Sequence, residues 1–245
     1  MIMEYEIVSN VGNRDHNEDY ACGTLMAGNN RQRGFFVLAD GLGGHGRGEV
    51  ASQFVANMCM EYYSRNNASD DFIEKSIEYA QEGLLQLQKL ENAKDEMKTT
   101  IVVLRIDEES ICWAHVGDSR LYFFYKNKLV TRTLDHSIPQ MLALAGEINE
   151  QDIRKHPERN KLLRVMGTDW EEAQYAVSDV VKRKDREAFL LCTDGFWENI
   201  TEKEMVKCLK KSKSAKQWLD SMNKIVQERG KNEDMDNNTA LVVIT

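Results

Sequence analysis

Apolar residues recur along this chain at two different spacings. In segments 49–63 and 72–87 they return every three to four positions, so each segment predicts an amphipathic helix. The spacing then becomes strand-like in four runs: 99–106, 111–116, 121–125 and 129–131. Short polar turns separate these runs, and the sequence therefore predicts an antiparallel meander.

Three more strands follow from almost continuous apolar runs. Segments 35–39 and 189–193 carry few polar residues, which predicts buried strands, and a last strand is expected at 239–244. Because strands and helices occur in separate blocks, the pattern favours an α+β layered sandwich over a regular βαβ alternation.

Two late helices are marked by their first residues. Thr201 is followed by Glu204, and Ser214 by Gln217, in the spacing of a capping box. The second helix should end at Gly230, since glycine commonly terminates helices.

Acidic motifs stand beside these apolar runs. Four of the five follow or precede a strand-like segment, so the fold can bring their carboxylates together. Clustered carboxylates repel one another unless a cation lies between them. Oxygen ligands without matching cysteine or histidine favour magnesium or manganese over zinc. The motifs are Asn17-Glu18-Asp19, Asp40-Gly41, Asp118-Ser119-Arg120, Asp194-Gly195 and Asp236-Asn237-Asn238-Thr239.

Each motif alone also has a structural interpretation. Asp-Gly pairs are common in hairpin turns, and Asp118 could be a turn residue in the same way. Segment 236–238 could be a polar loop. Arg14 and Glu18 could form an exposed ion pair of little consequence, and His45, among glycines, could be an exposed histidine without a catalytic role.

The order of the motifs changes these odds. Together they resemble the bacterial metal-dependent protein phosphatases of type 2C, over essentially the whole chain. The matching segments are 14–19 (RDHNED), 38–52 (LADGLGGHGRGEVAS), 114–120 (AHVGDSR), 135–137 (DHS), 146–148 (GEI), 156–160 (HPERN), 163–167 (LRVMG), 190–195 (LLCTDG) and 236–239 (DNNT).

The resemblance implies a four-layer αββα sandwich, with two antiparallel sheets packed face to face and helices on both outer faces. It implies one catalytic domain over residues 1–245, with a flap subdomain at about 137–170. The flap segment fits this expectation, because a helical run at 139–145 is followed by Gly146 and by another helical turn before His156-Pro157. The alternative is that this segment packs as an inert cover.

The resemblance also implies a centre with two divalent ions, Mn²⁺ or Mg²⁺. Asp40 would bridge the two ions. The Gly41 carbonyl and Glu18 would hold one of them, and Asp194 and Asp236 the other. A water bridging the ions would hydrolyse phosphoserine and phosphothreonine in proteins, since paired divalent ions lower the pKa of water and stabilise an in-line displacement.

Further roles follow from the same resemblance. Asp118 with Asp194 would form a third, weak metal site, and Asp19 would orient a metal-bound water. Arg14 would bind the substrate phosphate, because its planar guanidinium matches two phosphate oxygens. The general acid stays unassigned. Leu42 stands where eukaryotic relatives often carry a histidine, and His45 lies nearby.

Length and charge limit the other possibilities. The 245 residues suit one domain, since nothing in the middle resembles a linker. The net charge of −8 argues against binding to nucleic acid or an anionic membrane. The most basic stretches, 181–184 and 207–216, are interpreted as a solvated turn and a solvated helix face.

Compartment is inferred from cysteine usage and from absent signals. Five cysteines without C-x-x-C spacing predict reduced, mostly buried thiols in a reducing compartment: Cys22, Cys59, Cys112, Cys192 and Cys208. Residues 1–6 do not resemble a signal peptide, and no apolar run approaches the length of a membrane span. We therefore expect a cytoplasmic, monomeric enzyme that acts on phosphorylated proteins and opposes a serine/threonine kinase.

Two other classes of function fit the sequence less well. A pseudophosphatase would use the same fold as a binding or signalling module, but it should have lost metal ligands, and Glu18, Asp40, Asp118, Asp194 and Asp236 are all present. A metal phosphodiesterase or nuclease should show a basic groove, which this acidic composition disfavours.

Overall fold

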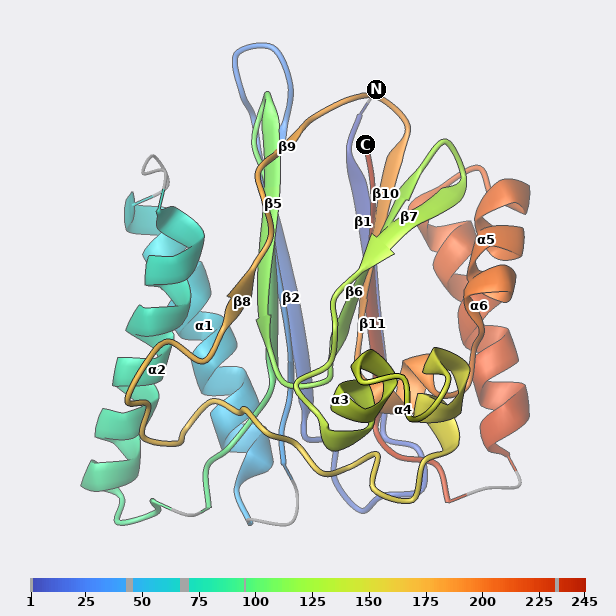
Figure 1. The fold of residues 1–245 in the computed structure, drawn as a ribbon. Helices are drawn as coiled ribbons and strands as arrows, with labels where there is room; N and C mark the ends of the chain where they lie inside the picture. The colour runs from blue at the N-terminus through green and yellow to red at the C-terminus, as the bar shows by residue number, and fades with distance from the viewer. Residues whose placement is uncertain (1, 43–45, 67–70, 95, 232–233) are drawn as a thin grey trace.

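Two β-sheets face each other at the centre of the molecule, and helices cover both outer faces (Figure 1). The computed structural model describes residues 2–42, 46–66, 71–94, 96–231 and 234–245. The helices α1 (Gly48–Asn66) and α2 (Phe72–Leu90) pack on one sheet, and α5 (Glu202–Lys211) and α6 (Ala215–Gly230) pack on the other. The expected four-layer αββα sandwich is confirmed.

The first sheet has the strand order β1-β11-β10-β6-β7, with neighbouring strands antiparallel. Its strands are β1 (Glu4–Asn10), β6 (Arg120–Tyr125), β7 (Lys128–Arg132), β10 (Glu187–Cys192) and β11 (Asn238–Ile244). The N-terminal strand therefore pairs with the C-terminal strand.

The second sheet has the order β2-β3-β4-β5-β8, with β9 also pairing to β5. Its strands are β2 (Asp19–Met26), β3 (Arg33–Asp40), β4 (Ile101–Ile106), β5 (Ser110–Val116), β8 (Ala176–Val177) and β9 (Val181–Lys182). This sheet carries two of the acidic motifs at the paired ends of β2 and β3.

The continuous apolar runs are explained by burial on both faces of each sheet. Along β3, Phe35 and Val37 pack against the helices, while Phe36 and Leu38 point into the layer between the sheets. The strand β10 alternates in the same way, with residues such as Leu190 facing α5 and α6. Side chains on successive positions point to opposite faces of a strand, so a strand covered on both sides needs apolar residues throughout.

The predicted four-stranded meander is wrong in its middle. The strands β4 and β5 pair in one sheet, and β6 and β7 pair in the other. The chain crosses between the sheets at Gly117, whose φ of +99° suits glycine best. A polar turn between two strands looks the same in sequence whether it closes a hairpin or connects two sheets.

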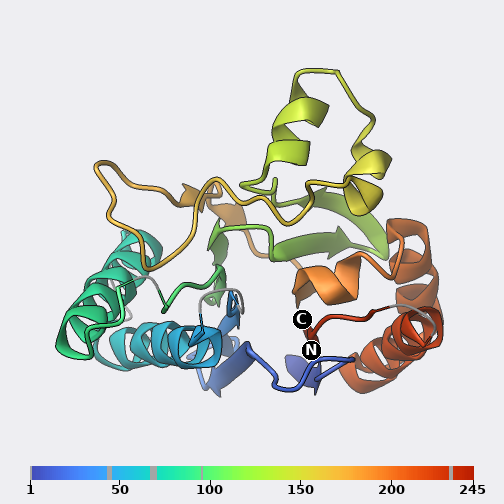
Figure 2. The ribbon, with the colours of Figure 1, turned by 90° about the horizontal axis from the view of Figure 1, so that it is seen from below.

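A segment between β7 and β8 projects to one side of the sandwich (Figure 2). It contains α3 (Ile138–Leu144) and the short 3₁₀ helix η2 (Glu150–Lys155), in agreement with the two helical turns predicted for the flap. Ser137 caps α3 by accepting the Gln140 backbone N–H, and Gly146 follows with φ +76°.

The prediction that both basic stretches, 181–184 and 207–216, lie in solvent is right for one and partly wrong for the other. In 207–216 the lysines are exposed, as predicted for a helix face in solvent. In 181–184 the prediction is wrong for Arg183, which is 6% exposed and donates hydrogen bonds to the carbonyls of Gln32 and Asp107. Of the helices in the described part of the chain, none has the length and apolar character needed to span a bilayer.

Candidate active site

The acidic motifs meet at one end of the sandwich, where they line a cavity of about 740 Å³. Because neighbouring strands run antiparallel, β3 and β10 end at the edge where β2 and β11 begin. The lining includes the predicted phosphate-binding residue and every predicted metal ligand: Arg14, Glu18, Asp40, Gly41, Asp118, Asp194 and Asp236. Asp19 lies beneath this surface and is 8% exposed.

Asp40 and Asp19 face each other as a cross-strand pair of β3 and β2. Hydrogen bonds from the residues just before β4 hold the Asp40 backbone in place. The Thr99 hydroxyl donates to the Asp40 carbonyl at 2.7 Å, and the Asp40 N–H donates to the Thr100 hydroxyl at 3.1 Å. Asp19 accepts the Thr193 hydroxyl at 2.9 Å, which links the two sheets beneath the cavity.

The glycines after Asp40 and Asp194 allow close backbone approach. A Cβ on Gly41 would lie 2.3 Å from the Gly48 carbonyl oxygen, and a Cβ on Gly195 would lie 2.2 Å from the Asn237 oxygen. Neither Asp-Gly pair closes a hairpin, since β3 leads toward α1 and Asp194 opens the short helix α4 (Asp194–Trp197). Chain crowding therefore fixes both glycines at the site.

Asn237 anchors the loop that carries Glu18 and Arg14. Its side-chain oxygen accepts the Glu18 N–H at 2.8 Å, and its amide donates to the carbonyls of Val11 and His16. The sequence placed Asn237 in a motif without giving it this role, because hydrogen bonds to a backbone segment more than 200 positions away cannot be predicted from spacing.

Asp118 reaches the cavity from the crossover between the two sheets. Its backbone carbonyl accepts the indole N–H of Trp197 at 3.0 Å. Next to it, the Ser119 hydroxyl lies 2.7 Å from the Thr100 hydroxyl. Asp118 is 5% exposed, so its carboxylate is held largely out of solvent.

Burial and mutual repulsion raise the pKa of these carboxyls. Burial raises the pKa of Asp19 to about 7, and it raises the pKa of Asp194 to about 6 with a further contribution from Asp236. The pKa of Asp40 is raised well above its usual value by burial and then by Asp19, and the pKa of Asp118 by burial and then by Asp194. A divalent cation would relieve this cost, because opposite charge favours the ionised form.

The donor set fits such cations. It consists of carboxylate oxygens and one backbone carbonyl, the ligands that Mg²⁺ and Mn²⁺ prefer, and Asp19 Oδ1 is buried without a hydrogen-bond partner. The set is not preassembled. Within the described ranges, no three acidic, histidine or cysteine side chains surround a common point closely enough to form a ligand cluster.

Arg14 lies at the cavity rim and pairs with Asp236. Its Nε and a terminal nitrogen donate to the two carboxylate oxygens, each at 2.9 Å. The alternative Arg14–Glu18 ion pair is not among the ion pairs found in the described residues. His45 lies outside the described residues, whereas Leu42 lines the cavity.

Glu198 is a further candidate functional residue, and the sequence did not reveal it. It follows α4 directly, and burial and the charge of Asp194 raise its pKa to about 7. Arg159, from the flap segment, approaches Glu198 at 2.9 Å. Since Glu198 stands four residues after Asp194, a predicted helix there would have placed both on one face, but so short a helix leaves no periodic signal.

Comparisons with known proteins agree with this arrangement. The profile of the family described as protein phosphatase 2C matches residues 9–238. The serine/threonine phosphatase stp of Listeria welshimeri is 31% identical over 214 residues, which are 84% of this chain and 82% of that protein. The crystal structure of serine/threonine phosphatase Stp1 from Staphylococcus aureus is 27% identical, has a TM-score of 0.83, and covers 100% of this chain and 96% of its own. The PstP catalytic domain in complex with two manganese ions has a TM-score of 0.80 at 23% identity and covers 99% of this chain and 98% of its own, which shows the same fold.

Proposed function

Because this chain belongs to the protein phosphatase 2C family, we propose that the cavity beside Asp40 is where it hydrolyses phosphoserine and phosphothreonine in proteins. One observation carries the assignment of the site. Buried carboxylates from both sheets converge on one cavity, with pKa values raised by burial and by one another. Such an arrangement is unfavourable without bound cations and suits a metal-dependent hydrolase.

Residues from both sheets would hold two core ions. We assign Asp40 to both ions, Glu18 and the Gly41 carbonyl to one, and Asp194 and Asp236 to the other. When bound, paired divalent ions supply an activated water nucleophile and neutralise the charge that develops on the phosphoryl group. The hydroxyls of Thr99 and Thr100 hydrogen-bond to the Asp40 backbone and hold Asp40 in register for this role.

Arg14 would recognise the substrate. Its guanidinium stands at the mouth of the cavity, 46% exposed, with its fork directed at the Asp236 carboxylate. A phosphate dianion offers the same bidentate geometry as that carboxylate. Arg14 would therefore exchange Asp236 for the phosphate when Asp236 binds metal.

Asp19 would act from below the metal centre. It lies opposite Asp40, and one of its oxygens is fixed by Thr193 while the other has no partner. The unpartnered oxygen suits a carboxylate that orients a water molecule and receives its proton.

Asp118 and Asp194 would hold a third, weaker ion. They line the same cavity, and Asp194 is the largest charged contributor to the raised pKa of Asp118. Because only two protein carboxylates are available to that ion, water would complete its coordination and binding should be weak.

The proposal extends to the metal, the compartment, the substrates and the oligomeric state. We propose Mn²⁺ or Mg²⁺ as the metal, since the donors are hard oxygens and a protein of this fold was crystallised with manganese. Free cysteines support a reducing, cytoplasmic environment. Phosphorylated proteins are the substrates, and a serine/threonine kinase would supply them. One chain provides all the site residues, which supports a monomeric catalytic domain that includes the flap at about 137–170.

A catalytically silent pseudophosphatase is the alternative. It would lack one or more metal ligands, yet every proposed ligand lines the cavity.

The proposal is tested by metal removal. Hydrolysis of a phosphothreonine peptide and of p-nitrophenyl phosphate should stop after exhaustive chelation with EDTA and return when Mn²⁺ or Mg²⁺ is added. A matched zinc addition controls for nonspecific ionic effects and should restore much less activity. Full activity in the metal-free protein would refute the mechanism, and inactivity with every metal would favour the pseudophosphatase.

A further inference from the structure

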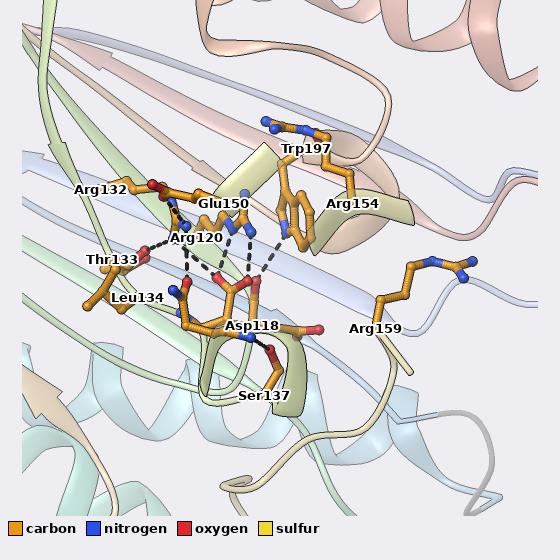
Figure 3. Close-up of polar contacts among 12 residues, drawn as sticks. Asp118, Arg120, Arg132, Thr133, Leu134, Ser137, Glu150, Arg154, Arg159 and Trp197 are labelled. Atoms are coloured by element: carbon orange, nitrogen blue, oxygen red, sulfur yellow. Dashed lines mark hydrogen bonds and ion pairs between the residues drawn. The ribbon is translucent and has the colours of Figure 1, made fainter. Parts of the chain in front are cut away.

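Trp197, in the helix that begins at Asp194, is hydrogen-bonded to the backbone of Asp118 (Figure 3). Asp194 is the first residue of α4 and Trp197 is the last, so one helical turn separates them. The indole N–H of Trp197 donates to the backbone carbonyl of Asp118 at 3.0 Å, although Asp118 lies 79 positions earlier in the chain. The helix that carries Asp194 is thus bonded to the backbone of Asp118.

The indole itself is fixed from behind. Trp197 is 2% exposed, and the guanidinium carbon of Arg120 lies 3.4 Å from its ring centroid. Stacked arginine and tryptophan attract each other through the ring quadrupole. Arg120 begins β6, two residues after Asp118, so the stack and the hydrogen bond connect the same two segments.

Arg120 is in turn held rigidly. Asp135 accepts two of its N–H groups at 2.8 and 2.6 Å, and the Tyr122 hydroxyl accepts a third at 3.0 Å. Asp135 stands just before the flap, and at the next position the His136 N–H donates to the Gly117 carbonyl. The backbone on both sides of Asp118 is therefore tied to neighbouring elements.

We infer that Trp197 is a positioning residue that sets the spacing between the Asp118 and Asp194 carboxylates. The inference rests on the proposed function, in which these two groups hold the third ion. A rigid spacing matters most for that ion, because few protein ligands bind it and each misplaced oxygen weakens it. Asp194 also holds one core ion, but Asp40, Glu18 and Asp236 hold the core ions as well. The Trp197 hydrogen bond involves none of those three, so core binding should depend on it less.

The chain offers a matched control in Trp218. This residue of α6 is also fully buried and donates its indole N–H to a backbone carbonyl, that of Met205, at 3.2 Å. It packs on Phe124, in the layer between the first sheet and its helices. Trp197→Phe and Trp218→Phe therefore remove the same atoms and the same kind of bond, one beside the third site and one away from it.

The test is a Mn²⁺ titration of both variants and the wild type, with free Mn²⁺ counted by electron paramagnetic resonance. In Trp197→Phe, the dissociation constant of the weakest ion should rise about tenfold, which corresponds to about 1.4 kcal/mol. The two tighter ions should change less than twofold, and Trp218→Phe should leave all three unchanged. Identical titrations for the two variants, or a wild type that binds only two ions, would overturn the inference.

A second measurement covers the case in which Trp197→Phe does not fold. In wild-type protein with ¹⁵N-labelled tryptophan, Mg²⁺ should shift the Trp197 indole signal in the weak phase of the titration, while the Trp218 signal stays in place. Asp118→Ala should abolish that shift. A Trp197 signal that does not respond refutes the inference, whereas loss of phosphopeptide hydrolysis by wild-type protein with metal would instead refute the proposed function.

Discussion

Replacement of Asp19 by asparagine should stabilise the metal-free protein at alkaline pH. Asp19 is buried opposite Asp40, and one of its oxygens has no hydrogen-bond partner. Asparagine has nearly the same shape, and its oxygen can still accept the Thr193 hydroxyl. The substitution therefore removes a buried charge with little change in packing.

The size of the effect follows from the pKa of Asp19. Burial raises this pKa from 3.8 to about 7, and a difference of that size corresponds to about 4 kcal/mol of unfolding free energy once the group is ionised in both states. The folded-state pKa is the higher one, so the folded protein retains a proton that the unfolded chain loses. Stability is accordingly present below about pH 4 and is lost as the pH rises through about 7. The gain from Asp19→Asn should be about 4 kcal/mol at pH 8 and about 2 kcal/mol at pH 5.

Urea unfolding in EDTA at both pH values measures these gains. The difference between the two pH values is the decisive quantity, because effects of the substitution on packing are the same at pH 5 and pH 8 and cancel. Asp179→Asn, at an exposed position between β8 and β9, is the control and should change stability little at either pH. Equal gains for Asp19→Asn at both pH values, or a loss at pH 8, would refute the argument that ionisation of Asp19 destabilises the fold.

Three further substitutions test the assigned roles. Asp40→Asn should lower kcat on phosphopeptides by about a thousandfold or more, because it removes the carboxylate shared by both core ions. Circular-dichroism melts should show that the metal-free variant is folded. An unfolded variant or near-normal turnover would contradict the assignment of Asp40. Arg14→Ala should mainly raise KM for phosphorylated substrates and leave metal affinity in calorimetry equal or slightly higher, since the Arg14–Asp236 ion pair no longer competes for that ligand; loss of metal binding would make Arg14 a structural residue. Asp118→Ala should keep two bound ions and normal stability but lose most activity on phosphopeptides. A crystal structure of the wild type at high Mn²⁺ checks whether Asp118 and Asp194 hold a third ion. Wild-type turnover by the variant would show that Asp118 is only a turn residue.

Local pattern predicted the secondary structure wherever burial is one-sided or complete. The helices α1 and α2 have one buried face, and β3 and β10 are buried on both, so apolar spacing identifies all four. The strand β1 was missed because it is a sheet edge whose residues alternate only between exposed and half-buried. The helix α4 was missed because four residues are too few to show a period.

The sequence predicted the carboxylates of the candidate site but not the residues that hold those carboxylates in place. Acidic residues at strand ends are visible in sequence as motifs, and the resemblance gave them roles. The residues that hold them in place act over long distances in the chain: Asn237 fixes Glu18, and Trp197 fixes Asp118. Their sequence signals are those of an ordinary polar loop and an ordinary core aromatic, so only the three-dimensional contacts distinguish them.

The layer between the two sheets has a consequence for how this protein can vary. Asp40 extends from one sheet and Asp194 from the other, and side chains such as Phe36 and Leu241 fill the space between those sheets. The thickness of this layer therefore sets the distance between the Asp40 and Asp194 ligands. A change of volume there would alter the distance between ligands even where the fold tolerates it. The two outer layers beneath the helices do not separate the sheets, so apart from Trp197 and its partners, amino-acid replacements should accumulate more freely in them than in the middle.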